Sequence, residues 1–122
     1  MRKLWGSAVT PVGYSAGAGG EVTQITSKAT GVTLDKMCGT ITMNAAELAA
    51  AAIVSFTVTN AKVTATDLVL IQHDSVATLG KYLVSANTMA AGSFNVTVTN
   101  ISAGNLSEAI VLRFAIIRAV IT

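Results

Sequence analysis

The sequence predicts an all-β protein: an antiparallel β-sandwich, jelly-roll-like or related, with a flexible N-terminal arm and at most one short helix. Threonine, valine and isoleucine make up 39 of the 122 residues, and β-branched side chains favour the pleated, half-buried surface of a strand. Several segments alternate apolar and polar residues. Glycine, asparagine, aspartate and serine separate these segments at spacings that suit a sandwich or a barrel.

The first twenty residues are predicted to form the arm, and residues 21–122 the sandwich domain. The segment 13–20 holds four of the ten glycines, and ordering a glycine-rich chain is entropically costly. Ahead of it lie Arg2, Lys3 and the single tryptophan, Trp5. Tryptophan and arginine contribute disproportionately to interfaces. We therefore expect these three residues to dock on a partner or a neighbouring subunit; the alternative is that Trp5 folds back on its own sandwich.

The clearest strands are residues 53–60 and 93–100. The first places Val54, Phe56 and Val58 on one face. The second shows the same alternation, with an inward row of Phe94, Val96 and Val98. Each ends at an asparagine, a residue that tolerates turns. Further strands are expected at residues 22–26, 39–43, 67–73 and 80–86.

A single short helix or helical turn is the most that the sequence predicts, after residue 44. Asn44 and Glu47 have the spacing of a capping box, and they precede Leu48 and four alanines, which favour helix.

The last predicted strand, residues 109–121, is apolar on both faces. Its even positions carry a continuous apolar row from Ile110 to Ile116. A strand buried on both faces needs a second covering layer, and a chain of this length has to find that layer in another subunit. The predicted subunit interface consists of the odd positions Val111, Arg113, Ala115, Ile117 and Ala119.

Composition also excludes several classes of protein. Charged residues are 11 % of the chain, against roughly 25 % in average soluble proteins, so the apolar excess favours an obligate oligomer. The longest apolar run has seven residues, 48–54, whereas a membrane-spanning helix needs about 18. The net charge of +2 is scattered, which argues against a nucleic-acid partner.

No catalytic, metal or cofactor site is predicted, and we do not expect an enzyme. His73, Asp74 and Ser75 contain the residue types of a hydrolase triad, but triad members are assembled by folding and need no adjacency; a polar turn at a strand end explains them better. The single histidine and single cysteine provide no cluster with metal-ligand spacing. Cys38 is expected to behave as a small buried apolar residue.

Five stretches carry a resemblance to a known family: GGEVTQITSKATGVTL at 19–34, GTITMN at 39–44, VSFTVTN at 54–60, AGSF at 91–94 and SAGNLSEAI at 102–110. Together they resemble a small β-sandwich module of tailed-bacteriophage structural proteins, over about residues 19–121. The module is found in head decoration or cement proteins and in terminal domains of tail fibres or spikes, typically as a homotrimer.

The resemblance implies a place in a virion more strongly than one role. The expected function is a homotrimeric capsid decoration protein that binds and stabilises the phage head. Its partners would be other copies of itself and the major capsid protein or other virion proteins, with synthesis in the host bacterial cytoplasm. The alternative is a fibre or spike tip that displays residues 74–79 and 101–106 to a receptor or carbohydrate.

Overall fold

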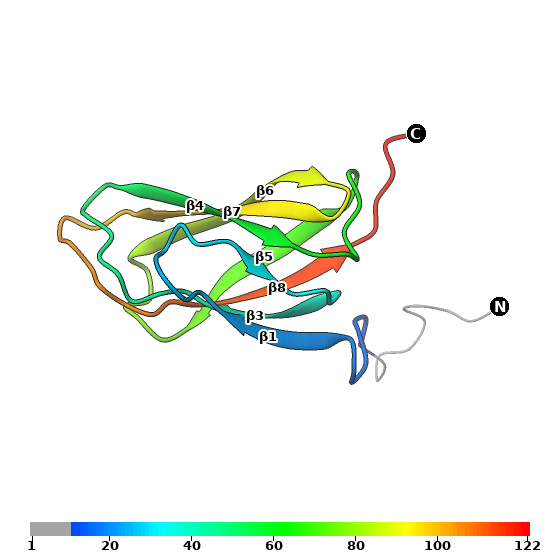
Figure 1. The fold of residues 1–122 in the computed structure, drawn as a ribbon, viewed down its shortest axis with the longest axis horizontal. Coiled ribbons are helices and arrows are strands. Elements are labelled where there is room, and N and C mark those ends of the chain that lie inside the picture. Colours follow the sequence, from blue (N-terminus) through cyan, green and yellow to red (C-terminus); the bar gives the residue numbers. More distant parts are fainter. Residues whose placement is uncertain (1–10) are drawn as a thin grey trace.

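The structure, a computed structural model, describes residues 11–122 and shows a sandwich of two four-stranded sheets (Figure 1). Sheet A has the strand order β1-β3-β8-β5 and sheet B the order β2-β4-β7-β6. The strands are β1 Gly19–Thr23, β2 Val32–Thr33, β3 Cys38–Thr42, β4 Ile53–Thr59, β5 Leu68–Ser75, β6 Tyr82–Ala90, β7 Ser93–Asn100 and β8 Val111–Ile117. The predicted all-β sandwich is confirmed.

Four of the strand pairs are antiparallel, and β1–β3 and β2–β4 are parallel. The parallel pairs arise because β1, β2, β3 and β4 alternate between the two sheets. A strand that leaves one sheet, crosses to the other and returns can run in its original direction, whereas a tight hairpin reverses it.

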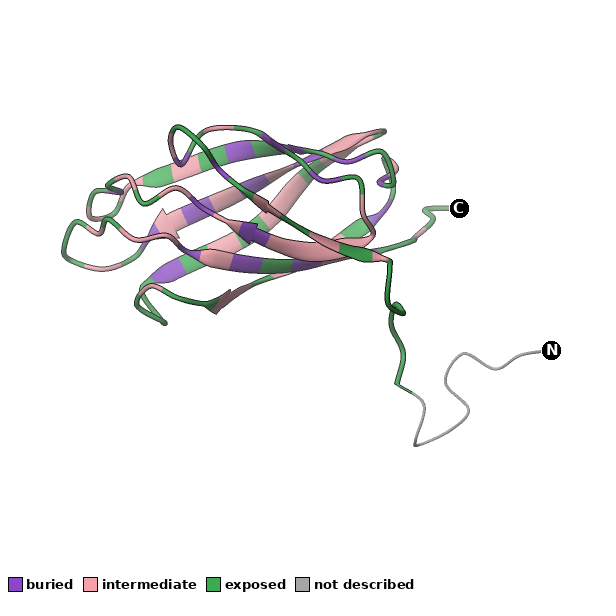
Figure 2. Ribbon diagram, turned by 60° about the horizontal axis from the view of Figure 1, so that its bottom comes forward, coloured by how far each residue is buried: buried purple, intermediate pink, exposed green. Residues whose placement is uncertain are grey.

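The core lies between the sheets and is built from the inward positions of both. Phe94 of β7 and Phe114 of β8 meet there, with ring centroids 5.7 Å apart and an interplanar angle of 57°, a tilted geometry that aromatic pairs favour. Inward and outward residues alternate along β4, β7 and β8 (Figure 2). The inward rows of the predicted strands 53–60 and 93–100 are confirmed.

Several strand boundaries differ from prediction. Strand β1 begins at Gly19 because Gly19 and Gly20 pair with Cys38 and Gly39, so the sheet starts two residues inside the predicted arm. The last strand ends at Ile117, opposite Leu68, where its partner β5 begins. The predicted strand to residue 121 was too long because no neighbour continues the ladder.

No helix forms in the segment after residue 44, or elsewhere in the described residues 11–122. The Asn44 side chain accepts a hydrogen bond from the Ala46 amide at 2.8 Å. Leu48 instead exchanges two backbone hydrogen bonds with Leu106, and the following alanines make a turn in which Ala51 has φ 63°. Pairing with a distant segment thus overrides the local helical preference.

Candidate functional site

The outward face of sheet A carries the predicted subunit interface. Strand register places its outward side chains in cross-strand rows. One row crosses all four strands through Gly19, Cys38, Ala115 and Leu70, and the next crosses them through Glu21, Thr40, Arg113 and Gln72. Beside the first row, Ile117 pairs with Leu68 at the end of the sheet near the C-terminal segment.

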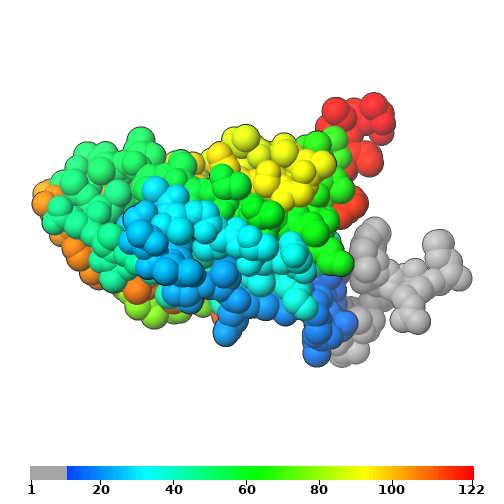
Figure 3. Space-filling model, viewed as in Figure 1, coloured from blue at the N-terminus to red at the C-terminus, as the bar shows by residue number. Residues whose placement is uncertain are grey.

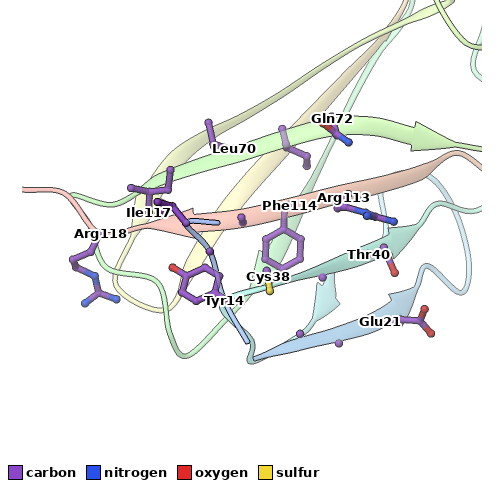
Figure 4. A pocket seen from close by; sticks show the side chains of 17 residues that line it. Tyr14, Glu21, Cys38, Thr40, Leu70, Gln72, Arg113, Phe114, Ile117 and Arg118 are labelled. Carbon is purple, nitrogen blue, oxygen red and sulfur yellow. The ribbon is translucent and has the colours of Figure 1, made fainter. Parts of the chain in front are cut away.

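The first row is hollow because three of its four side chains are small. Glycine, cysteine and alanine stand on β1, β3 and β8, so the sheet surface dips beneath them. Residues 12–14 run along one side of this dip, and the Tyr14 hydroxyl donates a hydrogen bond to the Ile116 carbonyl of β8. The resulting groove, which we call the sheet A groove, has a volume of about 1460 Å³ (Figure 4).

One end of the groove is lined mainly by apolar side chains, with Arg118, which pairs with Asp67, at its margin, and the other end is polar. Figure 4 shows Tyr14 and Ile117 at one end, with Glu21, Thr40 and Arg113 toward the other. At the apolar end the side chains of Leu70 and Ile117 are solvent-exposed, with 60 % and 43 % of their surface accessible. Large apolar residues that share an exposed face mark interaction sites more often than isolated ones do.

An ion pair defines the polar end. Arg113 Nη2 lies 3.2 Å from Asp74 Oδ2, and Asp74 also accepts a hydrogen bond from the Ser75 hydroxyl at 3.3 Å. The arginine is exposed, so the pair itself contributes little to stability. The Arg113–Asp74 pair instead marks where the apolar region of the face ends.

The structure brings four of the five predicted interface residues together. Val111, Arg113, Ala115 and Ile117 all point outward from the central strand β8, whereas Ala119 lies beyond its end, where its carbonyl accepts a hydrogen bond from Thr66. The predicted docking residues Arg2, Lys3 and Trp5 lie outside the described residues. Cys38, expected to be buried, is only half-buried, because it occupies an outward position on β3.

The outward face of sheet B has a different chemistry. Its central positions are short polar side chains that hydrogen-bond to one another across strands. Ser55 and Thr97 hydroxyls lie 2.8 Å apart, Thr57 donates to Asn95 at 3.0 Å, and Asn87 donates to Thr97 at 2.9 Å. These central polar groups bond to one another, and the exposed aliphatic residues of the face, Ile53 and Leu83, stand apart on either side of Thr99. The groove of sheet A is the stronger candidate for a binding surface because it is concave as well as apolar.

A carboxylate clamp holds the loop between β5 and β6. Glu108 accepts a hydrogen bond from the Tyr82 hydroxyl at 2.7 Å, and from the Thr78 hydroxyl and amide at 2.9 and 3.2 Å. The bond from Tyr82, together with those from Thr78, lowers the pKa of Glu108. Burial and the Glu108 carboxylate raise the pKa of Tyr82. The His73 ring bonds to the Val76 carbonyl at 2.7 Å, so the cluster acts as a structural clamp.

Lys28 is a buried cation that pattern reasoning missed. Only 3 % of its surface is accessible, and its ammonium group donates to the carbonyls of Asn44 and Glu108, the latter at 2.6 Å. Burial lowers the pKa of Lys28, while the charge of Glu108 opposes that change. Lysine is almost never fully buried, so no sequence signal identified it. Its role is to tie three loops together at one end of the sandwich.

The end of the sandwich that carries the C-terminal segment, drawn in red in Figure 3, is fastened by a buried carboxylate. Asp67 accepts a hydrogen bond from the Thr64 amide at 2.9 Å, and its other oxygen lies 2.9 Å from Arg118 Nε. Burial alone would raise the pKa of Asp67, but the hydrogen bonds from Thr64 and the Arg118 charge outweigh it and lower the pKa below 3.8. The folded state therefore favours the ionised form.

This pKa shift predicts a specific acid sensitivity. Because the folded-state pKa of Asp67 lies below the unfolded value, its stabilisation is present above about pH 3.8 and is lost as the pH falls through the folded-state pKa. Urea unfolding at pH 5 and pH 3 should show a smaller pH dependence in Asp67→Asn than in the wild type. Asp35→Asn, an exposed site, is the control. Equal pH dependence in the wild type and Asp67→Asn would contradict the assignment.

Within the described residues, no helix is long and apolar enough to cross a bilayer. In the same part of the chain, no group of three or more histidine, cysteine, aspartate and glutamate side chains could hold a metal ion. The sequence matches no family model, no curated protein and no solved structure.

Proposed function

We propose that this chain is a structural virion protein of a tailed bacteriophage, a homotrimer that binds the head surface as a decoration protein. Two arguments support the proposal. One is the resemblance of residues 19–34, 39–44, 54–60, 91–94 and 102–110 to a phage β-sandwich module. The other, which carries the self-association, is the exposed apolar face of sheet A around Ile117 and Leu70.

The physical role of such a trimer is to add buried interface across the joints between capsid subunits. An obligate oligomer buries roughly 2,000 Å² or more and hides a surface that resembles a core. Sheet A would contribute to such an interface through strand β8, whose inward side packs in the core and whose outward side is apolar at three of its four positions. The function needs no active site.

The alternative of a receptor-binding or carbohydrate-binding tip has weaker support. The loop at residues 101–106 begins beside Lys81, two residues after the loop at residues 74–79, since the Ile101 amide donates to the Lys81 carbonyl at 3.0 Å. Their exposed large side chains are the aliphatic Val76, Leu79 and Ile101. Aliphatic side chains do not offer a sugar ring the stacking platform that aromatic side chains provide.

Replacing Ile117 with aspartate tests the self-association. Light scattering of the wild type should give three times the 12.4 kDa of the single chain. The variant should scatter as a monomer or aggregate, because an unpaired charge in a dry interface costs several kcal/mol. Leu83→Asp is the matched control: Leu83 is an exposed aliphatic residue on the opposite sheet, and its replacement should leave the trimer intact.

A stable wild-type monomer at micromolar concentration would overturn the trimer. The place on the virion needs a separate test, in which particles that lack this protein are incubated with purified chain and imaged. Density on the head surface at regular positions supports decoration, whereas density confined to a fibre or spike contradicts it.

A further inference from the structure

The sheet A groove is wide enough for a polypeptide. Its volume of about 1460 Å³ exceeds the roughly 300–1,000 Å³ of pockets that hold small ligands. Its width spans all four strands of the sheet, from Gly19 on β1 to Leu70 on β5, and its length runs along the strands. A groove of this shape suits an extended segment with one large side chain more than a compact small molecule.

Its floor is shaped for a flat apolar side chain. The small residues Gly19, Cys38 and Ala115 stand side by side on three adjacent strands, so the dip is about 10 Å wide at the usual spacing between strands. Leu70 bounds it on the β5 side, and the Tyr14 ring lies at its apolar end (Figure 4). An aromatic ring seated in the dip would contact apolar atoms beneath it and on both flanks.

The chain itself carries a segment with the matching composition. Residues 1–10 include the single tryptophan, Trp5, and the basic pair Arg2 and Lys3. At the polar end of the groove the charges of Arg113 and Asp74 pair with each other, which leaves Glu21 as an exposed carboxylate without an ion-pair partner among the described residues. When the Trp5 ring lies in the apolar dip, Arg2 and Lys3 can therefore reach toward the negative charge of Glu21.

The length of this segment is also adequate. The described chain starts at residue 11, and Val12 lines the groove. The ten residues from 2 to 11 span about 33 Å when extended, whereas the seven residues of β8 span about 23 Å. A segment that reaches this face from another copy can therefore run along the whole groove.

We propose that the sheet A groove receives residues 1–10 of a neighbouring copy, with Trp5 over Cys38 and Ala115 and with Arg2 and Lys3 toward Glu21. This inference rests on the proposed homotrimer. The floor of the groove is the outward side of β8, which is the predicted interface. If a segment of the same chain covered this floor, the trimer would lose the apolar face through which its copies associate. A segment that leaves one copy and enters the next makes a heterologous contact, and three such contacts related by a three-fold rotation close into a ring.

The single tryptophan and the single cysteine permit a direct test. One variant, Cys38→Ser, keeps Trp5 as a fluorescent donor. A second variant combines Trp5→Phe, Cys38→Ser and Gln72→Cys and carries a thionitrobenzoate quencher at position 72, an exposed position in the row beside the dip, so that the dip itself stays open. The two are unfolded together in equal amounts and refolded, so that donor and quencher always reside on different chains. Donor emission should fall by about half, because a ring with one groove for each segment offers each tryptophan a labelled neighbour half of the time. The Cys38→Ser variant refolded with the unlabelled second variant is the control.

The outcomes separate this inference from the proposed function. A trimeric mass with unchanged donor emission overturns the inference and leaves the trimer standing. A monomeric wild type overturns the trimer itself. A third outcome concerns a single chain that carries both Trp5 and the quencher. If its emission is quenched at concentrations where light scattering reports monomers, the segment occupies the groove of its own chain, and the inference is overturned.

A second measurement uses the reactivity of the natural cysteine and needs no fluorescence quencher. Alkylation of Cys38 by iodoacetamide should be several-fold faster in Trp5→Ala than in wild-type trimers, because the indole no longer covers the thiol. Trp5→Phe should restore most of the protection, since a smaller aromatic ring still fills the dip. Equal rates in the wild type and Trp5→Ala, with both proteins trimeric by mass, would show that Trp5 lies elsewhere.

Discussion

Replacing Asn100 with aspartate is expected to lower the free energy of unfolding by about 4 kcal/mol. The side chain is fully buried at the end of β7. Its amide nitrogen donates to the carbonyls of Leu48 and Gly104, both at 2.9 Å, and its oxygen accepts from the Ser102 amide at 3.0 Å. Aspartate has nearly the same shape but cannot make either donation when ionised, so the carbonyls of Leu48 and Gly104 each lose this donor and instead face a buried negative charge.

The matched control is Asn105→Asp. Asn105 is exposed, and its side-chain oxygen only accepts a hydrogen bond from the Ala50 amide at 3.0 Å, which a carboxylate can also do. Urea unfolding at fixed protein concentration should place this control within about 0.5 kcal/mol of the wild type. A loss below about 1 kcal/mol in Asn100→Asp would mean that the asparagine network does not hold the loops as the hydrogen bonds indicate.

Replacing Gly39 with alanine should destabilise the sandwich by about 3 kcal/mol. A Cβ atom at this position would lie 2.2 Å from the carbonyl oxygen of Gly20 on the neighbouring strand β1, and 3.1 Å from a methyl carbon of Leu34. The first contact is with backbone, which cannot rotate away as a side chain can. We expect β1 to separate from β3, because the two strands pair at this point.

Gly104→Ala is the control, since no atom lies within 4 Å of a Cβ added there. Thermal unfolding should show a lower midpoint for Gly39→Ala and an almost unchanged one for the control. Hydrogen exchange should locate the damage, with faster exchange of the β1 and β3 amides. Wild-type stability in Gly39→Ala would show that the two strands tolerate a wider separation.

Local patterns were sufficient to predict the strands and their faces. The alternation through Phe56 and Val58, and again through Phe94 and Val96, lies within single segments. A period of two follows from the geometry of one strand, whatever its neighbours are. The doubly apolar character of β8 was predictable for the same reason, and with it the outward orientation of Arg113, Ala115 and Ile117.

Features that depend on which segments become neighbours could not be predicted. Strand β2 has two residues, too few for a periodic signal, and it exists because Val32 and Thr33 align with Val58 and Thr59. The fully buried asparagines of the two predicted strands, Asn60 and Asn100, were interpreted only as turn residues. Their side chains are buried because the loops that accept their hydrogen bonds fold over them.

Composition and period-two alternation therefore determined the all-β class, the principal strands and the two-faced final strand, because each of these depends on residues adjacent in the chain. Tertiary structure alone decided the sheet A groove. Its small residues Gly19, Cys38 and Ala115 lie far apart in the sequence, and only the register of β1, β3 and β8 sets them side by side. Strand register is a property of pairs of segments, selected by the whole packed core and invisible to any one of them.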